Sequence, residues 1–424
     1  MNSLSSNNAT CQKDFPKDWK QARLRYVARL AYGDSLTASQ REPGDVPVFG
    51  SNGIVGLHKL ANTLAPLIVV GRKGSFGKIT YSEDRGFVID TAYFIDSSCA
   101  KANLRWLYYA LQVLGLDEIS QDTGVPGLSR EKAYECRLLL PTIKDQEAIA
   151  HFLDRKTAAI ATLIAKKQRL IQLLEEKRTA LINQAVTKGL NPDAPMKDSG
   201  VPWIGEIPEH WESNVKLRYL TRKERGSFVN GPFGSDLLVS ELKPEGIPVI
   251  YIRDIKPYGY RRKSIVCVSQ EKANQLNLFR VDPGDVIIAK VGDPPGDSCI
   301  YPESEPPGIV TQDVIRLKLK TQYNSEYISF MMNSGLGTNL IGMISIASTR
   351  ERVSLGDFKS LRVVCPPITE QQRITSFLNS ETQYIDNLTS KTLASVEKLQ
   401  EYRRSLITAA VTGKLDIPKA EANV

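Results

Sequence analysis

Apolar residues recur at heptad spacing in two long stretches of the chain. In the first stretch the successive intervals are seven, four, seven, three, seven and four residues, at Leu153, Ile160, Ile164, Ile171, Leu174, Leu181 and Ala185. The second stretch repeats this seam, with one polar member, at Leu378, Ile385, Thr389, Val396, Leu399, Leu406 and Ala410. A single apolar stripe of this kind predicts a long helix that packs against a partner helix.

Both stretches are bounded by residues that interrupt helices. Pro141 and Pro366-Pro367 stand just before them, and proline cannot occupy a helix interior. Lys188-Gly189 and Thr412-Gly413 follow them, and glycine commonly ends a helix. Each helix is therefore predicted to contain about 40 residues and to be roughly 60 Å long, at 1.5 Å per residue.

The segments that precede the helices have a different pattern. Short β-type runs alternate there with turns rich in Gly, Pro and Asp, and the runs include Leu67–Val70, Gly86–Ile89, Ile247–Ile252 and Val286–Ala289. This pattern predicts two compact mixed domains. We expect a first domain over 1–140, a helical region over 141–190, a connector over 191–207, a second domain over 208–365, a second helical region over 366–415 and a tail over 416–424.

The chain repeats itself at a distance of 225 residues, the separation of Pro141 from Pro366. About 40% of the positions over 141–190 are identical to their partners without any gap, far more than two unrelated helices would share. Weaker sequence matches precede the helices. There, Pro16-Lys17-Asp18-Trp19 corresponds to Pro208-Glu209-His210-Trp211, Leu24-Arg25-Tyr26 corresponds to Leu217-Arg218-Tyr219, and Arg137 corresponds to Arg362. One duplication, followed by divergence of the globular parts, explains these matches.

The duplication also predicts how the helices pair. Because the chain runs from domain to helix and again from domain to helix, each helix has its own repeat as a partner, and the two should pair antiparallel about a pseudo-twofold axis. The predicted fold class is a duplicated α/β (α+β) chain. Two globular domains are separated by two long helices that form an antiparallel coiled coil.

Composition and charge restrict the function less than the repeat does. A chain of 424 residues with 42% hydrophobic and 24% charged residues is typical of two or three folded domains. A net charge of +8 permits a polyanionic partner without requiring one. No apolar run approaches the roughly 20 residues that span a bilayer, and Met1–Lys20 carries no apolar signal segment, so we expect a cytoplasmic protein. The scattered cysteines predict reduced, structural thiols, at Cys11, Cys99, Cys136, Cys267, Cys299 and Cys365.

Three segments resemble a known family. Leu140–Ile149 and Pro366–Ile374 look like the proline, acidic-Gln, Ile start of each conserved helix in the specificity subunits of type I restriction-modification systems. Met196–Trp211 is similar to that family's connector into the second domain. The first copy departs slightly, with a single proline and with Asp145 where the family usually has Glu. Together with the order domain, helix, domain, helix, the resemblance covers nearly the whole chain.

The resemblance implies a function for each part. Each globular domain would be a target recognition domain that reads one half of a split, asymmetric double-stranded DNA sequence, while the helices set the spacer and dock partner subunits. Two methyltransferase subunits would methylate adenine N6 with S-adenosylmethionine. Restriction subunits driven by ATP, with Mg²⁺, would cut unmodified DNA. These cofactors would be bound by the partners.

No constellation typical of an active site stands out. Gly292-Asp293-Pro294-Pro295-Gly296 resembles the Asp-Pro-Pro-aromatic loop with which amino-methyltransferases hold a flipped base, but Gly296 stands where the aromatic residue belongs. Asn230–Ser235 lacks the strand-loop-helix setting of an S-adenosylmethionine loop. The three histidines, His58, His151 and His210, are too isolated to suggest a metal site. We therefore predict a chain without catalysis, cofactor or metal of its own and interpret 292–296 as a tight turn.

Candidate DNA contacts lie in polar loops that carry basic residues. Glycines let a backbone approach the duplex, while Arg and Lys can meet phosphates or guanine edges. In the first domain the candidates are Ser51, Asn52, Arg72, Lys73, Ser75 and Lys78. In the second domain they are Tyr258, Tyr260, Arg261, Arg262, Lys263, Lys290, Thr349 and Arg350. Solvated surface hairpins are the alternative interpretation of both sets.

Two other functions remain open at this point. A fused methyltransferase or nuclease would need a cofactor loop or a carboxylate cluster, and neither is evident. A coiled-coil scaffold with two protein-binding heads would fit the same pattern of elements. Salt-dependent binding to duplex DNA separates this scaffold from a DNA-reading subunit.

Overall fold

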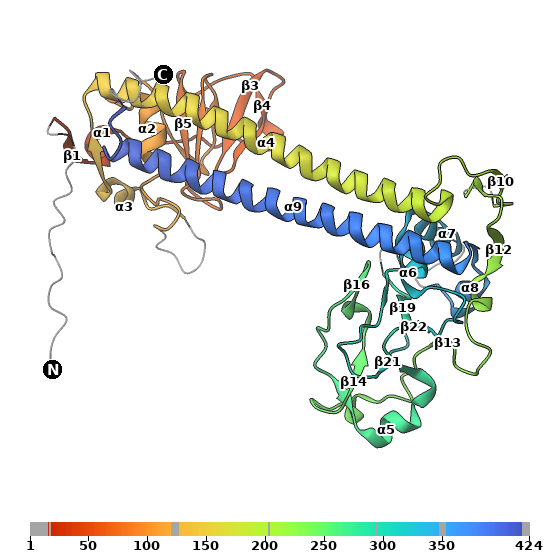
Figure 1. The fold of residues 1–424 in the computed structure, drawn as a ribbon. Coiled ribbons are helices and arrows are strands. Elements are labelled where there is room, and N and C mark those ends of the chain that lie inside the picture. The colour runs from red at the N-terminus through yellow and green to blue at the C-terminus, as the bar shows by residue number, and fades with distance from the viewer. Residues whose placement is uncertain are drawn as a thin grey trace. The chain divides into compact units, whose positions relative to one another are not determined.

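The computed structural model describes residues 16, 18–119, 127–201, 204–292, 295–346 and 353–417, with backbone only at 345 and 346. It divides into two compact units (Figure 1). The first unit combines Met1–Gln168 with Leu393–Val424, and the second is the contiguous segment Arg169–Thr392. Each unit therefore contains one globular domain and one part of each long helix.

Both predicted helices are present. Helix α4 spans Ile143–Lys188 and helix α9 spans Ile368–Val411, with 46 and 44 residues. Thr142 stabilises the start of α4, because its Oγ1 accepts a hydrogen bond from the Asp145 backbone N–H at 3.2 Å. Gly189 and Gly413 follow the last turns with positive φ angles of 72° and 69°, a conformation that glycine adopts readily.

The two helices pack against each other antiparallel within each unit. In the first unit, the early part of α4 shares a hydrophobic core with the late part of α9, through Leu153, Ile160, Leu406, Ile407 and Ala410. In the second unit, the late part of α4 shares a core with the early part of α9, through Ile182, Ala185, Val186, Ile374 and Leu378. The predicted antiparallel pairing is therefore confirmed.

The predicted seam residues lie on the inner side of this pair. Those that are buried are Leu153, Ile160, Leu174, Ala185, Leu378, Ile385, Val396, Leu406 and Ala410. Those that are half-buried are Ile164, Ile171, Leu181, Thr389 and Leu399. The seam of each helix therefore faces protein along its length.

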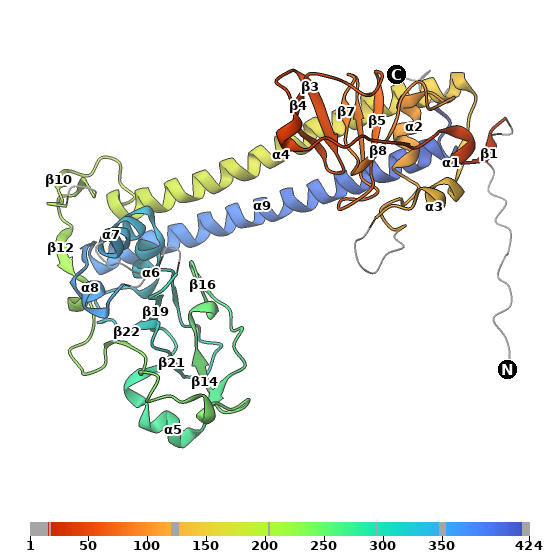
Figure 2. The same ribbon diagram turned by 180° about the vertical axis from the view of Figure 1, so that it is seen from behind.

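The first domain is built on two small sheets. The four-stranded sheet has the order β2 (Ala31–Tyr32), β8 (Ala92–Ile95), β5 (Leu67–Gly71) and β6 (Ile79–Ser82). The three-stranded sheet has the order β4 (Gly53–His58), β3 (Val46–Gly50) and β7 (Phe87–Val88). Short helices complete the domain at α1 (Leu24–Val27), α2 (Leu104–Leu111) and α3 (Arg130–Glu135). Figure 2 shows the sheet strands of this unit lying against its pair of helices.

The second domain repeats this plan in larger form. One four-stranded sheet has the order β13 (Phe228–Asn230), β22 (Val314–Leu317), β19 (Val286–Ala289) and β20 (Ser298–Ile300). The other has the order β17 (Cys267–Val268), β14 (Ile247–Ile250), β21 (Gly308–Val310) and β18 (Arg280–Val281). A small hairpin joins β15 (Ile255–Lys256) to β16 (Gly259–Tyr260), and the helices are α5 (Gln270–Gln275), α6 (Ser325–Asn333), α7 (Gly335–Ile346) and α8 (Leu355–Ser360).

The strand pairings match between the domains although their sequences diverge. Strand β5 pairs antiparallel with β6 and β8, as β19 does with β20 and β22. Strand β3 runs parallel to β7, as β14 does to β21. The duplication therefore includes the globular domains.

The junctions between domain and helix are also duplicated. Strand β1 (Lys20–Arg23) pairs antiparallel with β9 (Arg137–Leu140), and β12 (Glu212–Lys216) pairs in the same way with β23 (Arg362–Cys365). The connector forms a separate hairpin of β10 (Met196–Asp198) and β11 (Glu206–Pro208). Each pair of junction strands closes its domain beside the start of a long helix.

A glycine and a tryptophan meet at the end of each long helix. A Cβ atom built on Gly189 would lie 3.2 Å from the ring of Trp211, and one built on Gly413 would lie 3.2 Å from the ring of Trp19. Both tryptophans are buried. The end of α9 therefore contacts the first domain in the same way that the end of α4 contacts the second.

The structure also bears on the predicted state of the cysteines and on membrane-spanning helices. Cys99, Cys136, Cys267, Cys299 and Cys365 are free thiols, and Cys11 lies outside the described residues. Across the part of the chain that the structure describes, no helix has both the length and the apolar character needed to span a bilayer.

Candidate nucleic-acid interface

Arg72 begins the basic loop that follows β5, and its side chain is held in place by two kinds of contact. Its guanidinium carbon lies 5.0 Å from the ring centre of Tyr32 and 5.9 Å from that of Tyr93. Its Nη1 also donates a hydrogen bond to the Asp90 carbonyl oxygen at 3.0 Å. Planar stacking and a fixed hydrogen bond restrict an arginine that would otherwise sample many rotamers. Arg72 is thus a half-buried, oriented cation.

The structure brings the two predicted loops of the first domain together. Lys78 Nζ donates hydrogen bonds to the carbonyl oxygen of Asn52 at 3.1 Å and to its Oδ1 at 2.7 Å. A Cβ atom on Gly71 would come within 2.8 Å of the Ser51 carbonyl oxygen, so the loop backbones touch. Lys73 and Ser75 are exposed on the same loop as Arg72. These residues form one polar surface, which we call the first-domain basic surface and define by Ser51, Asn52, Arg72, Lys73, Ser75 and Lys78.

Two residues beside this surface were not identified from the sequence. Arg130, in α3, places its guanidinium carbon 4.7 Å from the ring centre of Tyr32. Tyr32 is 45% exposed, so Arg72 and Arg130 flank an accessible aromatic ring. Burial raises the pKa of the neighbouring Tyr93 to about 12, so that phenol stays neutral beside Arg72. No local signal marked Tyr32, because it is brought to Arg130 across about 100 residues of chain.

In the second domain a buried carboxylate organises the predicted basic loop. Asp254 is fully buried, and its Oδ1 accepts hydrogen bonds from the backbone N–H groups of Lys263 and Ser264 at 2.8 and 3.0 Å. Its Oδ2 accepts from the Tyr251 N–H at 2.9 Å. These bonds fix the loop backbone, and Arg261 and Lys263 are exposed on it. Asp254 is therefore a positioning residue that the sequence analysis missed.

Three other candidates in this loop are engaged within the domain. The Tyr258 hydroxyl donates to the Asn333 carbonyl oxygen at 3.2 Å, and its ring packs 5.2 Å from that of Phe330. The Tyr260 ring packs 5.1 Å from that of Tyr301, and burial raises the Tyr260 pKa well above its ordinary value. Arg262 forms an ion pair with Glu305 at 3.6 Å. Tyr258 and Tyr260 are half-buried and contribute to the packing of the domain, whereas Arg262 remains exposed beside its ion pair.

Lys290 occupies the position in the second domain that Arg72 occupies in the first. Arg72 directly follows β5 and Lys290 directly follows β19. The Arg72 backbone N–H donates to the Thr91 carbonyl oxygen at 2.9 Å, just before β8, and the Lys290 N–H donates to the Asp313 carbonyl oxygen at 2.8 Å, just before β22. Lys290 is only 8% exposed, however, whereas Arg72 is half-buried. The structure therefore does not present Lys290 at the surface that its sequence position predicted.

The remaining predictions fall in incompletely described segments. Thr349 and Arg350 lie outside the described residues, as do Asp293 and Pro294 of the predicted tight turn. Gly296 in that turn has a φ of 112°, and a Cβ atom there would lie 2.2 Å from Ile341 Cδ1. An aromatic side chain, as in the base-holding loop of amino-methyltransferases, therefore cannot be accommodated at this position without rearrangement.

Metal ions in proteins are commonly held by clusters of His, Cys, Asp and Glu side chains. No cluster of three or more such side chains occurs within the described ranges. The loops described above carry guanidinium, ammonium, amide and hydroxyl groups.

Comparison with known proteins agrees with this duplicated architecture. A family model described as the type I restriction modification DNA specificity domain matches twice, over residues 16–173 and 240–398, which together exceed half of the chain. The chain belongs to this family. Each match contains most of one globular domain and the beginning of the helix that follows it.

Individual relatives are similar over most of the chain. The specificity subunit of the type I restriction enzyme EcoBI from Escherichia coli is 20% identical over 365 residues, which cover 82% of this chain and 73% of that protein. A solved chain from work on complex assembly and conformational transition of the type I R-M system matches with a TM-score of 0.66 and 16% identity, covering 95% of this chain and 100% of that one. The HsdS subunit from Thermoanaerobacter tengcongensis matches with a TM-score of 0.53 and 15% identity, covering 96% and 99%. At these identities the solved structures establish a shared fold.

Proposed function

We propose that this specificity-family chain reads a two-part double-stranded DNA sequence, one part with each globular domain. The observation that carries the proposal is the duplicated family domain whose two copies each present a fixed loop with exposed cations. In the first copy the loop begins at Arg72, and in the second it contains Arg261 and Lys263. Phosphate contacts from such cations give affinity, and an oriented arginine can read the O6 and N7 acceptors of guanine.

Two methyltransferase subunits are the proposed partners on the helices. Large apolar residues are exposed one position before the seam on α4, at Leu163, Leu170 and Leu173, with exposed fractions of 44%, 39% and 44%. Phe377 and Tyr384 occupy the same flank of α9, with exposed fractions of 38% and 62%. The two rows lie at different positions of the repeat, because Leu163, Leu170 and Leu173 correspond to Leu388, Ser395 and Lys398. Each exposed apolar row fits a docked protein partner on its own helix.

The chain's own part in the reaction is to bind and to position. Methyl transfer from S-adenosylmethionine, and cleavage that consumes ATP with Mg²⁺, belong in this proposal to the methyltransferase and restriction subunits. The helices fix the register of the two recognition domains on DNA and carry the docking rows. We expect the protein to act in the cytoplasm.

Methylation mapping tests the proposal most directly. Genomes from cells that carry or lack this gene, with its methyltransferase partner present in both, are compared for N6-methyladenine. We expect a two-part motif with a constant spacer to be methylated only when the gene is present. Salt-independent or absent binding of the complex to duplex DNA, with no gene-dependent motif, would instead support the protein scaffold.

A further inference from the structure

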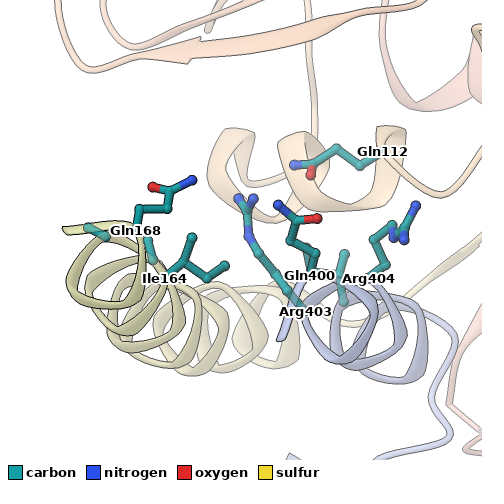
Figure 3. A pocket seen from close by; sticks show the side chains of 9 residues that line it. Gln112, Ile164, Gln168, Gln400, Arg403 and Arg404 are labelled. Carbon is teal, nitrogen blue, oxygen red and sulfur yellow. The ribbon is translucent and has the colours of Figure 1, made fainter. Parts of the chain in front are cut away.

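A cavity of about 490 Å³ opens between the two long helices and the end of α2 in the first unit. Its apolar floor is formed by Ile164 and Ile407 together with small residues of α4. Its polar groups come from three helices, at Gln112, Gln168, Gln400, Arg403 and Arg404. Figure 3 shows Arg403 and Gln400 rising from α9 into this space, with Gln168 on the facing helix and Gln112 on α2.

Arg403 brings a charge into the cavity without a counter-charge. Its Nε is buried and has no hydrogen-bond partner among the described residues. No ion pair within the described ranges involves its guanidinium either. A partly buried guanidinium without an acceptor is costly, because desolvation weakens its contact with water while nothing replaces that contact.

The duplicated arginine in the other unit also has a buried Nε without a hydrogen-bond partner, but it differs from Arg403 in having a counter-charge. Arg178 on α4 is the repeat partner of Arg403, since the two are separated by the repeat distance between Pro141 and Pro366. Its Nη2 lies 3.7 Å from a carboxylate oxygen of Asp386, and its guanidinium carbon lies 5.2 Å from the ring centre of Tyr258. The residue that corresponds to Asp386 in the first unit is Ala161, which lines the cavity. The corresponding cavity beside Arg178 is also smaller, at about 320 Å³.

We propose that Arg403, aided by Arg404 and the cavity glutamines, binds an acidic side chain of the docked methyltransferase subunit. This inference rests on the proposed function and adds to it a specific contact that only one of the two repeats can make. The carboxylate of an Asp or Glu from the partner takes the place that Asp386 holds in the second unit. The two docking surfaces of this pseudo-symmetric chain are therefore chemically unequal.

A carboxylate on a protein segment fits the cavity better than a DNA phosphate does. The floor beneath the guanidinium is aliphatic, at Ile164, Ile407, Ala161 and Ala165, and suits the methylene groups of an amino-acid side chain.

Calorimetric titration of the full chain with the methyltransferase subunit of its own system tests the contact. Arg403→Ala removes the cation, and Ala161→Asp supplies the carboxylate internally, as the second unit does with Asp386. We expect each change to weaken one of the two binding events at least tenfold. Ala161→Asn is isosteric with Ala161→Asp and measures the loss caused by bulk alone, so it should weaken binding less than Ala161→Asp does. Arg178→Ala is the matched arginine control and should leave the affinities within twofold of the wild type.

Each outcome bears on a different statement. Wild-type affinity in both Arg403→Ala and Ala161→Asp, with thermal melts that match the wild type, overturns the inference while leaving the proposed function intact. A loss of duplex DNA affinity by the isolated Arg403→Ala chain, with unchanged subunit affinity, also overturns it in favour of a phosphate contact. Failure of the wild-type chain to bind the methyltransferase subunit overturns the inference together with the proposed partnership.

Discussion

The buried side chain of Gln146 accepts a hydrogen bond from the backbone N–H of Asn103, with 2.8 Å between Oε1 and nitrogen. Its Nε2 donates to the Pro141 carbonyl oxygen at 2.9 Å. Asn103 in turn caps α2 by accepting from the Trp106 N–H. One amide side chain thus joins the start of a domain helix to the start of a long helix.

The same pair of side-chain hydrogen bonds exists in the second unit, where Gln371 accepts from the Asn324 N–H at 2.8 Å and donates to the Pro366 carbonyl oxygen at 2.7 Å. Replacing Gln146 with Leu leaves a buried N–H unpaired and should cost about 1–3 kcal/mol locally. Hydrogen exchange measured by mass spectrometry should accelerate in the peptide that contains Asn103 and not in the one that contains Asn324. Gln371→Leu should give the reverse pattern. Equal acceleration of both peptides would contradict a local effect of each glutamine on its own helix start.

The first-domain basic surface should contribute directly to DNA affinity. Arg72→Ala or Lys73→Ala should weaken binding of the assembled enzyme to its own target by about 1–3 kcal/mol where a base contact is lost. A lost phosphate contact would weaken all sequences alike and reduce the salt dependence. Lys59→Ala is the control, because Lys59 is an exposed cation of the same domain that pairs with Glu42. Unchanged affinity in both test variants would remove this loop from the interface.

The two helix-ending glycines should be sensitive to any side chain. Gly189→Ala places a Cβ atom 2.9 Å from Glu370 Oε1, and Gly413→Ala places one 2.7 Å from Pro16 Cδ, each at a positive φ. We expect each substitution to lower the free energy of unfolding of its unit by about 1–2 kcal/mol or more. Gly234→Ala, where no atom lies within 4 Å of the new Cβ, serves as the control in chemical denaturation. Equal stability of all three variants would show that the helix ends relax freely.

Buried thiols should resist alkylation in the folded chain. Burial raises the pKa of Cys299 and of Cys365 to about 12, so each thiol remains protonated at pH 8. Since the thiolate is the nucleophile, its fraction and therefore the reaction rate increase only as the pH approaches these raised values. Peptide mapping after iodoacetamide treatment should find Cys136, which is half-exposed, modified before either buried residue. Fast labelling of Cys365 without unfolding would contradict this assignment.

The helices should set the length of DNA between the two half-sites. Adding one heptad between Leu163 and Leu174 and another between Leu388 and Leu399 keeps the seam in phase and lengthens each helix by roughly 10 Å. That length is about three base pairs at 3.4 Å each. Methylation mapping should find both half-sites unchanged and the spacer longer. An active heptad variant that keeps the original spacer would show that the helices do not measure DNA.

The long helices were predictable because their signal is local and repeated. Heptad spacing, flanking prolines and following glycines lie within single segments, and the repeat showed that the pattern occurs twice. Strand Val286–Ala289 was also predicted with its observed bounds, whereas β14 ends at Ile250 because a short 3₁₀ turn over Ile252–Asp254 follows. Local patterns are least informative at the ends of elements, where turn geometry decides.

The candidate interface was predictable only in part, because its geometry depends on contacts between distant segments. Basic loops could be found by composition, but the hydrogen bonds from Lys78 to Asn52 depend on how β4 and β5 are placed. The stacking of Arg130 on Tyr32 and the burial of Lys290 likewise follow from tertiary packing. The chemical groups carried by the loops could be proposed from the sequence, whereas the exposure of each side chain could not.

The discontinuous first unit has a consequence for synthesis of the chain. Its core includes Leu406 and Ala410, so Arg169–Thr392 must be translated before the N-terminal domain can be completed. At about 5–20 residues per second, this takes on the order of 10 to 45 s on the ribosome. During that interval the apolar faces of Leu153 and Ile160 lack the α9 residues that cover them. The domain that leaves the ribosome first is therefore the last to be finished.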